Sequence, residues 1–432
     1  MARRRGKLLS LILTVGILST TFTGCSSSNN STEDGVAKIS IWTQEGQVVE
    51  QEYYKDAIEQ FNELYEGQIE ATLQMIPRGN GYEYENKINA AATSGSLPDI
   101  IAMDGPSVAN YADSGIIVPI DEYFTEDKLE DFVPSIITQG TVDGQLYALG
   151  ASESTVVLFY NKDVLDAAGI QAPTTLEDAW TWQEVYEIAK QLKTDDMYGI
   201  NLEWDLGEGQ IYGFAPIIWS NGGELLSEDG KEIDGYLNSD KSIEALEFYQ
   251  KFAVEGLINL QPLPNDFEEG KSAMYLMGSW EIQTIEESYP DFNYGITYYP
   301  KFSETSKVVS PSGDWCFGIT SGSKNQEAAA KLVEFLTSAE EVQEYCSAIS
   351  KPPARISVFD TMEEYQDESR KVIKDQVINT AHPRPISTSY PVLSNEFASA
   401  LQDIRTGVDV KETLSKVVTR FEEDIKLSLI HI

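Results

Sequence analysis

The feature that most constrains the fold is a regular alternation of strand and helix patterns between residues 37 and 104. Apolar residues alternate with polar ones in "KISIW" and again in "QIEATLQM", and "PDIIAMD" is a short apolar run. Between these runs, apolar residues recur at helical spacing before Gly67, and a second helix is expected from about residue 82 to 93. This βαβαβ order predicts a parallel sheet with helices on both faces.

A second set of elements follows from residue 156 onward. The pattern predicts a strand at 156–160 with a helix that ends at Gly169, a helix that starts with a Thr181–Glu184 capping box, and a helix between Ser239 and Gly256. Further strands are expected in "YGINLEW", "KSAMYLMGSW", "FNYGITYYP" and "DWCFGITSGS". A helix follows in "NQEAAAKLVEFLTS", and a helix-rich region begins near Ser394. At 432 residues the chain is too long for one ordinary core, so we expect two α/β lobes.

Composition excludes several classes of function. The chain has 70 acidic and 31 basic residues and a formal net charge of -39, which repels nucleic acid phosphates and acidic lipids. A neutral or cationic ligand fits this charge better. There are two histidines, and His431 lies in the last residues, so a histidine triad or a multi-histidine metal site is not expected. We therefore expect no metal and no cofactor.

The chain begins with the pattern of a bacterial secretion signal. Basic residues precede an apolar run from about Leu8 to Leu18, which is too short to span a membrane. The following "TFTGC" resembles the lipobox of bacterial lipoproteins, although Phe22 replaces the usual leucine. The resemblance implies that residues 1–24 are removed and that Cys25 carries a lipid. Residues 25–36 are then a flexible tether, and the alternative is a plain secreted protein.

Two further predictions concern the cysteines and the C-terminus. Beyond Cys25, only Cys316 and Cys346 remain, so there is no disulfide framework, although a single bridge between these two stays open. The closing "LSLIHI" resembles a reading frame of a common sequencing adapter. We therefore expect residues 427–432 to be a non-native tail.

Several segments, taken in order, resemble the extracellular solute-binding proteins of carbohydrate ABC importers, the group that includes maltose-binding proteins. They are "PDIIAMDGPSVANYADSGIIVPID", "VVLFYNKDVLDAAGI", "AWTWQEVYEIAKQLK", "WSNGGELL", "FEEGKSAMYLMGSW" and "GDWCFGITSGSKNQEAAAKLVEFL". The resemblance implies the periplasmic-binding-protein fold, in which two discontinuous lobes, each a doubly wound sheet flanked by helices, enclose a ligand cleft. Lobe 1 is expected to comprise 37–150 and 300–350, and lobe 2 to comprise 151–299 and 351–426.

The same resemblance implies the function. We expect a monomeric, non-enzymatic lipoprotein on the extracellular face of the cell membrane, held there through its lipid alone. It would capture a sugar or oligosaccharide and deliver it to the transmembrane permease subunits of an ABC importer. The sequence leaves open which sugar is bound, and related proteins also take glycerol phosphates.

Sugar recognition uses aromatic rings for the apolar sugar face and carboxylates for the hydroxyls. Four tryptophans stand at expected strand ends or loop entrances, and Trp280 and Trp315 match positions where the family stacks sugar: Trp42, Trp219, Trp280 and Trp315. Core packing is the alternative for each of them, and it is the expectation for Trp180 and Trp182. The role of Trp204 is left open.

Acidic residues close to expected strand ends complete the candidate site, because ligands bind beyond the carboxyl ends of parallel strands. These candidates are Glu45, Asp104, Glu153 and Asp314. A solvated surface position is the alternative for each. Arg355 fits either the cleft or a surface ion pair. The segment "GEGQIYG" misses the spacing of a dinucleotide-binding motif by one residue.

Two other classes of function compete with an importer subunit. An anchored glycoside hydrolase would also combine acids with aromatic residues, and it would need two carboxylates roughly 5 to 9.5 Å apart. A surface adhesin would bind polymers on an exposed face and would not need a cleft that closes. Turnover of oligosaccharides distinguishes the first, and ligand-induced compaction distinguishes the second.

Overall fold

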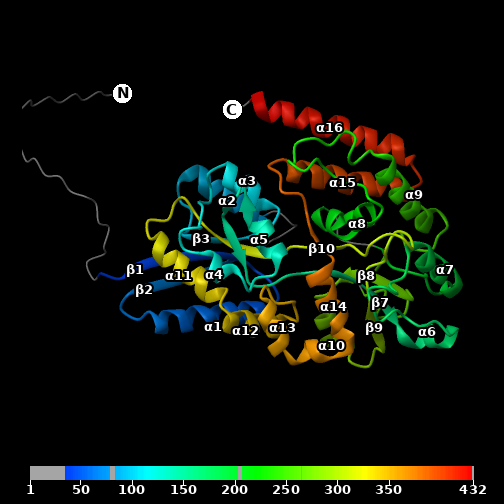
Figure 1. The fold of residues 1–432 in the computed structure, drawn as a ribbon, viewed down its shortest axis with the longest axis horizontal. Coiled ribbons are helices and arrows are strands. Elements are labelled where there is room, and N and C mark those ends of the chain that lie inside the picture. The colour runs from blue at the N-terminus through cyan, green and yellow to red at the C-terminus, as the bar shows by residue number, and fades with distance from the viewer. Residues whose placement is uncertain (1–34, 78–82, 203–206, 264, 431–432) are drawn as a thin grey trace, which may run out of the picture.

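The computed structural model describes residues 35–77, 83–202, 207–263 and 265–430. The predicted signal peptide, Cys25, nearly all of the tether, Trp204 and the last two residues of the expected tail lie outside this part of the chain. Figure 1 shows two groups of helices and strands side by side, joined by several chain segments. The predicted two-lobe α/β fold is confirmed.

Lobe 1 is built on a five-stranded sheet. Its strand order is β2 (Ile69–Ile76), β1 (Ala37–Gln44), β3 (Ile100–Asp104), β11 (Trp315–Ile319) and β6 (Ala148–Gly150). β1 is parallel to β2 and β3, as the βαβαβ pattern predicts, whereas β11 is antiparallel to β3 and β6. A strand from the C-terminal third of the chain therefore completes the N-terminal sheet.

Alternation along the strands gives this sheet two buried faces, because successive side chains point to opposite sides. Ile39 and Ile41 of β1 pack in one core with α1 (Val48–Leu64). Ile101 and Met103 of β3 belong to a second core together with residues of α2 (Glu83–Ser94). The remaining elements of this lobe are α3 (Ser107–Asp113), α4 (Glu126–Leu129), α5 (Pro134–Gly140), β4 (Thr141–Val142), β5 (Gln145–Leu146), α11 (Gln326–Leu336), α12 (Ala339–Ile349) and α13 (Ile356–Thr361).

Lobe 2 contains a smaller antiparallel sheet and a stack of helices. The sheet has β7 (Val156–Asn161) between β8 (Met274–Gly278) and β9 (Tyr294–Thr297), and both pairings are antiparallel, so the doubly wound sheet expected in this lobe is not formed by the described residues. α8 (Glu208–Ser220) is buried at every position from Gln210 on, as expected for a helix that is apolar all round. The other elements are α6 (Lys162–Ala168), α7 (Trp182–Leu192), α9 (Asp240–Val254), α10 (Glu281–Ser288), η1 (Glu363–Gln366), α14 (Glu368–Asn379), α15 (Tyr390–Arg405) and α16 (Val410–Ile430).

The helix boundaries follow the predicted local signals. Thr181 accepts a hydrogen bond from the backbone N–H of Glu184, and the Glu184 side chain accepts one from the backbone of Thr181, so the capping box is present. The side chain of Ser239 caps α9. Gly169 ends α6 with a φ of 70°, which a residue without a Cβ adopts at little cost.

One predicted strand is not formed in the part of "YGINLEW" that the structure describes. Residues 198–202 make only isolated parallel bridges, Tyr198 with Ser272 and Asn201 with Tyr275. The backbone N–H groups of Gly199 and Ile200 point away from β8 and donate to the carbonyl of Leu257. A continuous ladder with β8 is therefore interrupted, and the prediction of a regular strand here is wrong.

Short backbone pairings hold together the segments that lie between the lobes. The backbone of Glu153 donates to the Pro352 carbonyl at 2.8 Å, and that of Ala354 donates to the Ala151 carbonyl at 3.1 Å. Nearby, β10 (Ser310–Ser312) pairs in parallel with β12 (Ala381–Pro383). These short pairings fix the crossing segments to one another, and β10 lies between the lobes in Figure 1.

The lobe bounds expected from the sequence stay a prediction. Lys301 exchanges backbone hydrogen bonds with Trp180 and Trp182 of lobe 2, and α13 packs on α12 of lobe 1. Both contacts lie within a few residues of the expected lobe bounds at 300 and 351. Cys316 and Cys346 are both free and buried, so the alternative of a disulfide between them is not realised.

Candidate functional site

An aromatic surface stands at the carboxyl end of the lobe 1 sheet. Trp42 of β1 and Trp315 of β11 are half-buried, and Trp315 pairs in register with Asp104 of β3. Tyr84 of α2 is fully buried, and its ring centroid lies 5.6 Å from that of Trp315. The Tyr84 hydroxyl lies 3.0 Å from the carbonyl of Trp42 and 2.6 Å from that of Ala102. Tyr84 therefore contacts both tryptophans from the buried core, Trp315 through its ring and Trp42 through its hydroxyl.

One face of Trp42 is covered by a cation. The Nζ atom of Lys87, one turn along α2 from Tyr84, lies 4.7 Å from the centroid of the Trp42 ring. Such a contact stabilises the ring through the attraction between the positive charge and the ring quadrupole.

Lobe 2 presents the half-buried ring of Trp280, which packs on the buried Tyr212. Tyr212 of α8 and Trp280, which precedes α10, have ring centroids 6.0 Å apart at 36°. A Cβ at Gly278 would lie 2.2 Å from the Trp280 ring, so the absence of a side chain at Gly278 lets the indole lie over the end of β8. The Tyr212 hydroxyl makes a 2.6 Å hydrogen bond with the Ser154 hydroxyl in the crossing segment. Burial raises the Tyr212 pKa well above its usual value, so the phenol stays protonated.

A buried arginine connects the two aromatic surfaces. Arg384 forms two hydrogen bonds with the Asp104 carboxylate, at 2.7 and 3.1 Å, and a third contact with Glu208. Its guanidinium carbon lies 5.0 Å from the centroid of the Tyr212 ring. The Tyr390 hydroxyl donates to Glu208 at 2.7 Å. We call the whole set the interlobe site: Trp42, Tyr84, Asp104, Glu208, Tyr212, Trp280, Trp315, Arg384 and Tyr390.

Two candidate acids lie in the crossing segments instead. Glu153 is fully buried and accepts hydrogen bonds from the Ser135 hydroxyl, from the backbone of Ser154 at 2.8 Å and from the backbone of Gly313 at 2.5 Å. Burial raises its pKa to about 7, although these three donors favour the charged form.

Asp314 is also buried. It accepts a hydrogen bond from the Ser152 hydroxyl at 2.6 Å and pairs with Lys351 at 2.9 Å. Apart from Ser135 of α5, the partners of both acids therefore lie in or next to the segments that join the lobes.

The other sequence candidates have separate surroundings. Trp219 is 6% exposed and stacks on His382, whereas Glu45 is exposed just after β1. Arg355 pairs with Asp131 at 3.4 Å and donates to the Thr337 carbonyl at 2.7 Å. Of the two alternatives for Arg355, the structure therefore shows the ion pair. The structure thus brings Trp42, Asp104, Trp280 and Trp315 into the interlobe site and leaves Trp219, Glu153, Asp314 and Glu45 outside it.

Sequence reasoning missed several members of the interlobe site. Glu208 and Tyr212 lie in "GEGQIYG", four residues apart on one face of α8, a spacing that could have indicated a shared surface. Arg384 stands in "AHPRP". The chain is rich in acids, yet none stands close to Arg384 in the sequence. This isolation was the sequence signal that Arg384 could pair with acids from distant parts of the chain.

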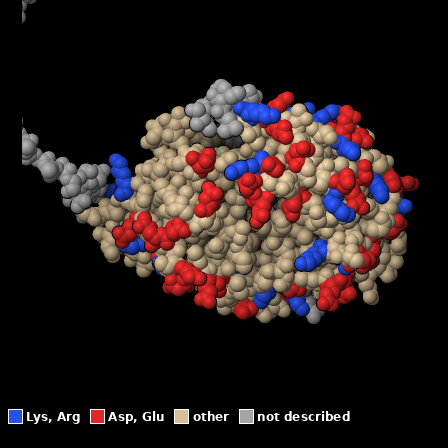
Figure 2. All heavy atoms as spheres, turned by 45° about the horizontal axis from the view of Figure 1, so that its top comes forward, with Lys and Arg blue, Asp and Glu red and all other residues tan. Residues whose placement is uncertain are grey.

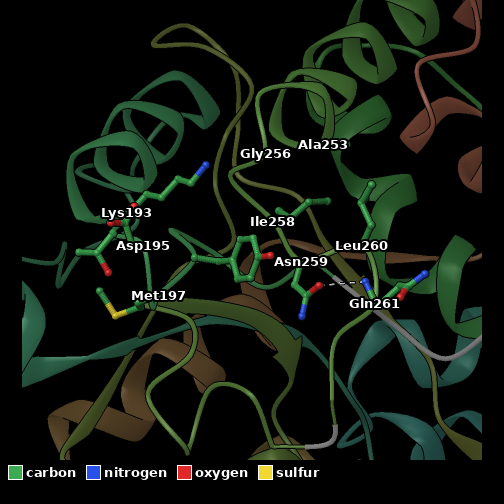
Figure 3. A pocket seen from close by; sticks show the side chains of 11 residues that line it. Lys193, Asp195, Met197, Ala253, Gly256, Ile258, Asn259, Leu260 and Gln261 are labelled. Carbon is green, nitrogen blue, oxygen red and sulfur yellow. Dashed lines mark hydrogen bonds between the residues drawn. The ribbon is translucent and has the colours of Figure 1, made fainter.

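Other surface features do not belong to this site. A pocket of about 560 Å³ lies in lobe 2 between residues 193–198 and the chain that follows α9, and none of its lining residues is in the interlobe site (Figure 3). On the face shown in Figure 2, acidic side chains are spread among fewer basic ones and no large basic patch gathers. Within the described residues, no three His, Cys, Asp or Glu side chains are grouped to hold a metal ion.

Comparison with known proteins identifies the family. Residues 56–371 match the bacterial extracellular solute-binding proteins, and the chain belongs to this family. It is 24% identical over 388 residues to the galactooligosaccharide-binding protein of Bacillus subtilis, covering 86% of both chains. It is also 24% identical to the maltooligosaccharide ABC transporter solute-binding lipoprotein of Streptococcus pneumoniae (strain R6), covering 99% of both.

Solved structures of similar proteins have the same fold. The cyclic alpha-maltosyl-1,6-maltose binding protein of Arthrobacter globiformis matches with a TM-score of 0.77 at 23% identity, over 90% of this chain and 99% of its own. The sugar-binding protein MalE of Xanthomonas citri matches with a TM-score of 0.78 at 20% identity, over 91% and 99%. No helix in the part of the chain that the structure describes has the length and apolar character needed to cross a membrane.

Proposed function

We propose that this protein is the substrate-binding component of a bacterial ABC importer, which captures an oligosaccharide between its two lobes and hands it to the permease. The observation that carries the proposal is that half-buried tryptophans of both lobes lie beside one buried ion-pair network, Trp42 and Trp315 on lobe 1 and Trp280 on lobe 2. Aromatic faces suit the apolar faces of sugar rings, and the buried polar groups between them suit the hydroxyls.

The names of the relatives support the class of ligand. A galactooligosaccharide-binding protein and a maltooligosaccharide-binding lipoprotein both match nearly the whole chain. A neutral oligosaccharide also agrees with the formal net charge of -39, because a strongly acidic surface disfavours anionic ligands. We therefore propose a neutral oligosaccharide of hexoses.

Binding without turnover fits the arrangement of the acids. Asp104 and Glu208 are both held in ion pairs with the Arg384 guanidinium, whereas a glycosidase needs one carboxyl group that can protonate the leaving group. The acid to test is Glu281, next to Trp280, because burial and the neighbouring Glu268 raise its pKa to about 7. Incubation with oligosaccharides should give no cleavage products, and products that disappear in Glu281→Gln would instead indicate a hydrolase.

Location and assembly complete the proposal. We propose that the mature protein is a monomer held on the extracellular face of the cell membrane by a lipid on Cys25, so that a short tether keeps it near the permease. The lipoprotein named among its relatives and the "TGC" sequence support the anchor.

The direct test is a thermal-shift screen of a sugar library, because a ligand that binds only the folded state raises the melting temperature. Malto- and galactooligosaccharides of two to six units, their component monosaccharides and a glycerol phosphate would be compared. We expect at least one oligosaccharide to raise the melting temperature in a saturable way. A flat response to every sugar would contradict the proposed function, and a response to glycerol phosphate alone would contradict the proposed ligand class.

A further inference from the structure

Arg384 lies where the two lobes meet. It follows β12, the strand that pairs with β10, and precedes α15 of lobe 2. Its side chain is 3% exposed, which is unusual for a residue that always carries a charge. A buried charge of this kind is tolerated only when opposite charges and hydrogen bonds replace the lost water.

The partners of Arg384 come from both lobes. Asp104 is the last residue of β3 in the lobe 1 sheet, and it receives two hydrogen bonds from the guanidinium. Glu208 is the first residue of α8 in lobe 2. The carbonyl of Gly313, in a crossing segment, accepts a further hydrogen bond at 3.3 Å.

The contacts on the lobe 2 side hold the guanidinium in place. The guanidinium carbon lies 5.0 Å from the centroid of the Tyr212 ring. The Tyr390 hydroxyl donates a hydrogen bond to the Glu208 carboxylate and so fixes this partner of Arg384. Arg384 is therefore held by residues of lobe 2 as well as by Asp104 of lobe 1. Asp104 is the partner that is lost if the lobes separate, because it belongs to the other sheet.

Loss of that partner has a clear energetic direction. A planar guanidinium with two parallel hydrogen bonds to one carboxylate is among the stronger ion-pair geometries, and it requires a defined distance and orientation. Separation of the lobes would leave Arg384 against Glu208 and Tyr212 without its bidentate partner, and loss of one partner of a buried charge is destabilising. The pair therefore favours arrangements of the lobes in which Asp104 and Arg384 are in contact.

We propose that Arg384 is a positioning residue that links the lobes. Through Asp104 it biases the ligand-free protein toward the arrangement of the lobes in which these two residues are in contact, and it holds the Asp104 carboxylate beside Trp315. The interlobe link does not depend on the identity of the ligand. The inference that it prepares the ligand site rests on the proposed function.

The test measures the distance between the lobes without any sugar. Dyes are attached at Glu59→Cys on α1 and Glu247→Cys on α9, both exposed positions, in a Cys25→Ser chain. The native thiols of Cys316 and Cys346 are buried and burial raises their pKa values, so they should not react. Energy transfer is then compared among Arg384→Met, Asp104→Asn and the unchanged parent.

Arg355→Met is the matched control. Arg355 also pairs with an aspartate, donates to a backbone carbonyl and lies 4.0 Å from an aromatic ring centroid, that of Phe132. All of these partners belong to lobe 1. We expect a longer interlobe distance in Arg384→Met and Asp104→Asn and an unchanged distance in Arg355→Met.

A conservative variant and a double variant complete the test. Asp104→Asn conserves size and shape, so it carries the test if Arg384→Met does not fold, as judged by circular dichroism. The double variant Arg384→Met/Asp104→Asn should open no further than the more open single variant, because both remove one interaction. An unchanged distance in folded Asp104→Asn, or additive opening in the double variant, would overturn the proposal. Because no sugar is present, neither result depends on whether the protein binds oligosaccharides.

Discussion

Trp219 stacks on His382, with ring centroids 4.1 Å apart and an interplanar angle of 21°. The contact joins the end of α8 to β12, far apart in sequence, and leaves the indole 6% exposed. Burial lowers the His382 pKa, so its ring is neutral at pH 7 and packs as a flat aromatic surface. One face of Trp219 is thus occupied by protein.

From this stacking we expect Trp219→Ala to act on stability. Loss of a large buried aromatic side chain costs about 3 to 5 kcal/mol of unfolding free energy. The affinity for sugar, measured by calorimetry on the folded fraction at low temperature, should change less than about threefold. If Trp219→Ala instead keeps the melting temperature and loses most of the affinity, the packing role is wrong.

The aromatic residues of the interlobe site should behave differently. We expect Trp280→Ala and Trp315→Ala each to weaken sugar binding by at least about 1 to 2 kcal/mol, because both rings are half-buried at the proposed contact surface. Trp180→Ala is the control: Trp180 is 8% exposed within the core, so its loss should lower stability and leave the intrinsic affinity nearly unchanged. Calorimetric titration of the three variants decides this, and normal affinity in both site variants would exclude the site.

The sequence predicts those parts of the fold that depend on local patterns. The capping box at Thr181, the stop at Gly169 and the alternation in β1 each depend on residues close together in the chain, and the structure has all three. The interrupted strand at 198–202 was not predictable, because its backbone hydrogen bonds go to Leu257, more than fifty residues away.

The candidate site was predicted only in part for the same reason. Trp42, Trp280 and Trp315 stand at strand ends or loop entrances and could be found from the pattern. Arg384 could not, because its partners Asp104 and Glu208 are 280 and 176 residues away. Glu153 and Asp314 were expected near the site from their positions, but their neighbours in the fold are hydrogen-bond donors from the crossing segments.

The pH dependence of stability should report on Glu153. Burial raises its pKa in the folded protein to about 7, against 4.5 as the ordinary value. A carboxyl with a raised folded pKa stabilises the folded state at low pH, and this stabilisation is lost as the pH rises from about 4.5 to 7. Glu153→Gln removes the titration, so its stability relative to the parent should rise by up to about 3 kcal/mol between pH 5 and 8.

Denaturant unfolding at several pH values measures this difference, with Glu45→Gln as the exposed control. The control should track the parent at every pH. A difference between Glu153→Gln and the parent that is constant from pH 5 to 8 would show that Glu153 is ionised throughout in the folded protein.

The membrane anchor gives a separate prediction. We expect Cys25→Ala to release the protein to the medium, because "TGC" follows a basic and then apolar segment and the substitution removes the acylated thiol. Fractionation of cells that express the parent or the variant measures this. Retention of the variant in washed membranes would contradict the lipid assignment.

The central claim is that the two lobes close on an oligosaccharide. The most direct measurement is energy transfer between labels at Glu59→Cys on α1 and Glu247→Cys on α9 during titration with the sugar that raises the melting temperature most. Contacts from both aromatic surfaces exist together only in the closed arrangement, so ligand must shift the population toward it. We predict a saturable shortening of the interlobe distance, with the same midpoint as calorimetric binding. An unchanged distance at saturation would contradict the account and would favour a rigid lectin or a hydrolase.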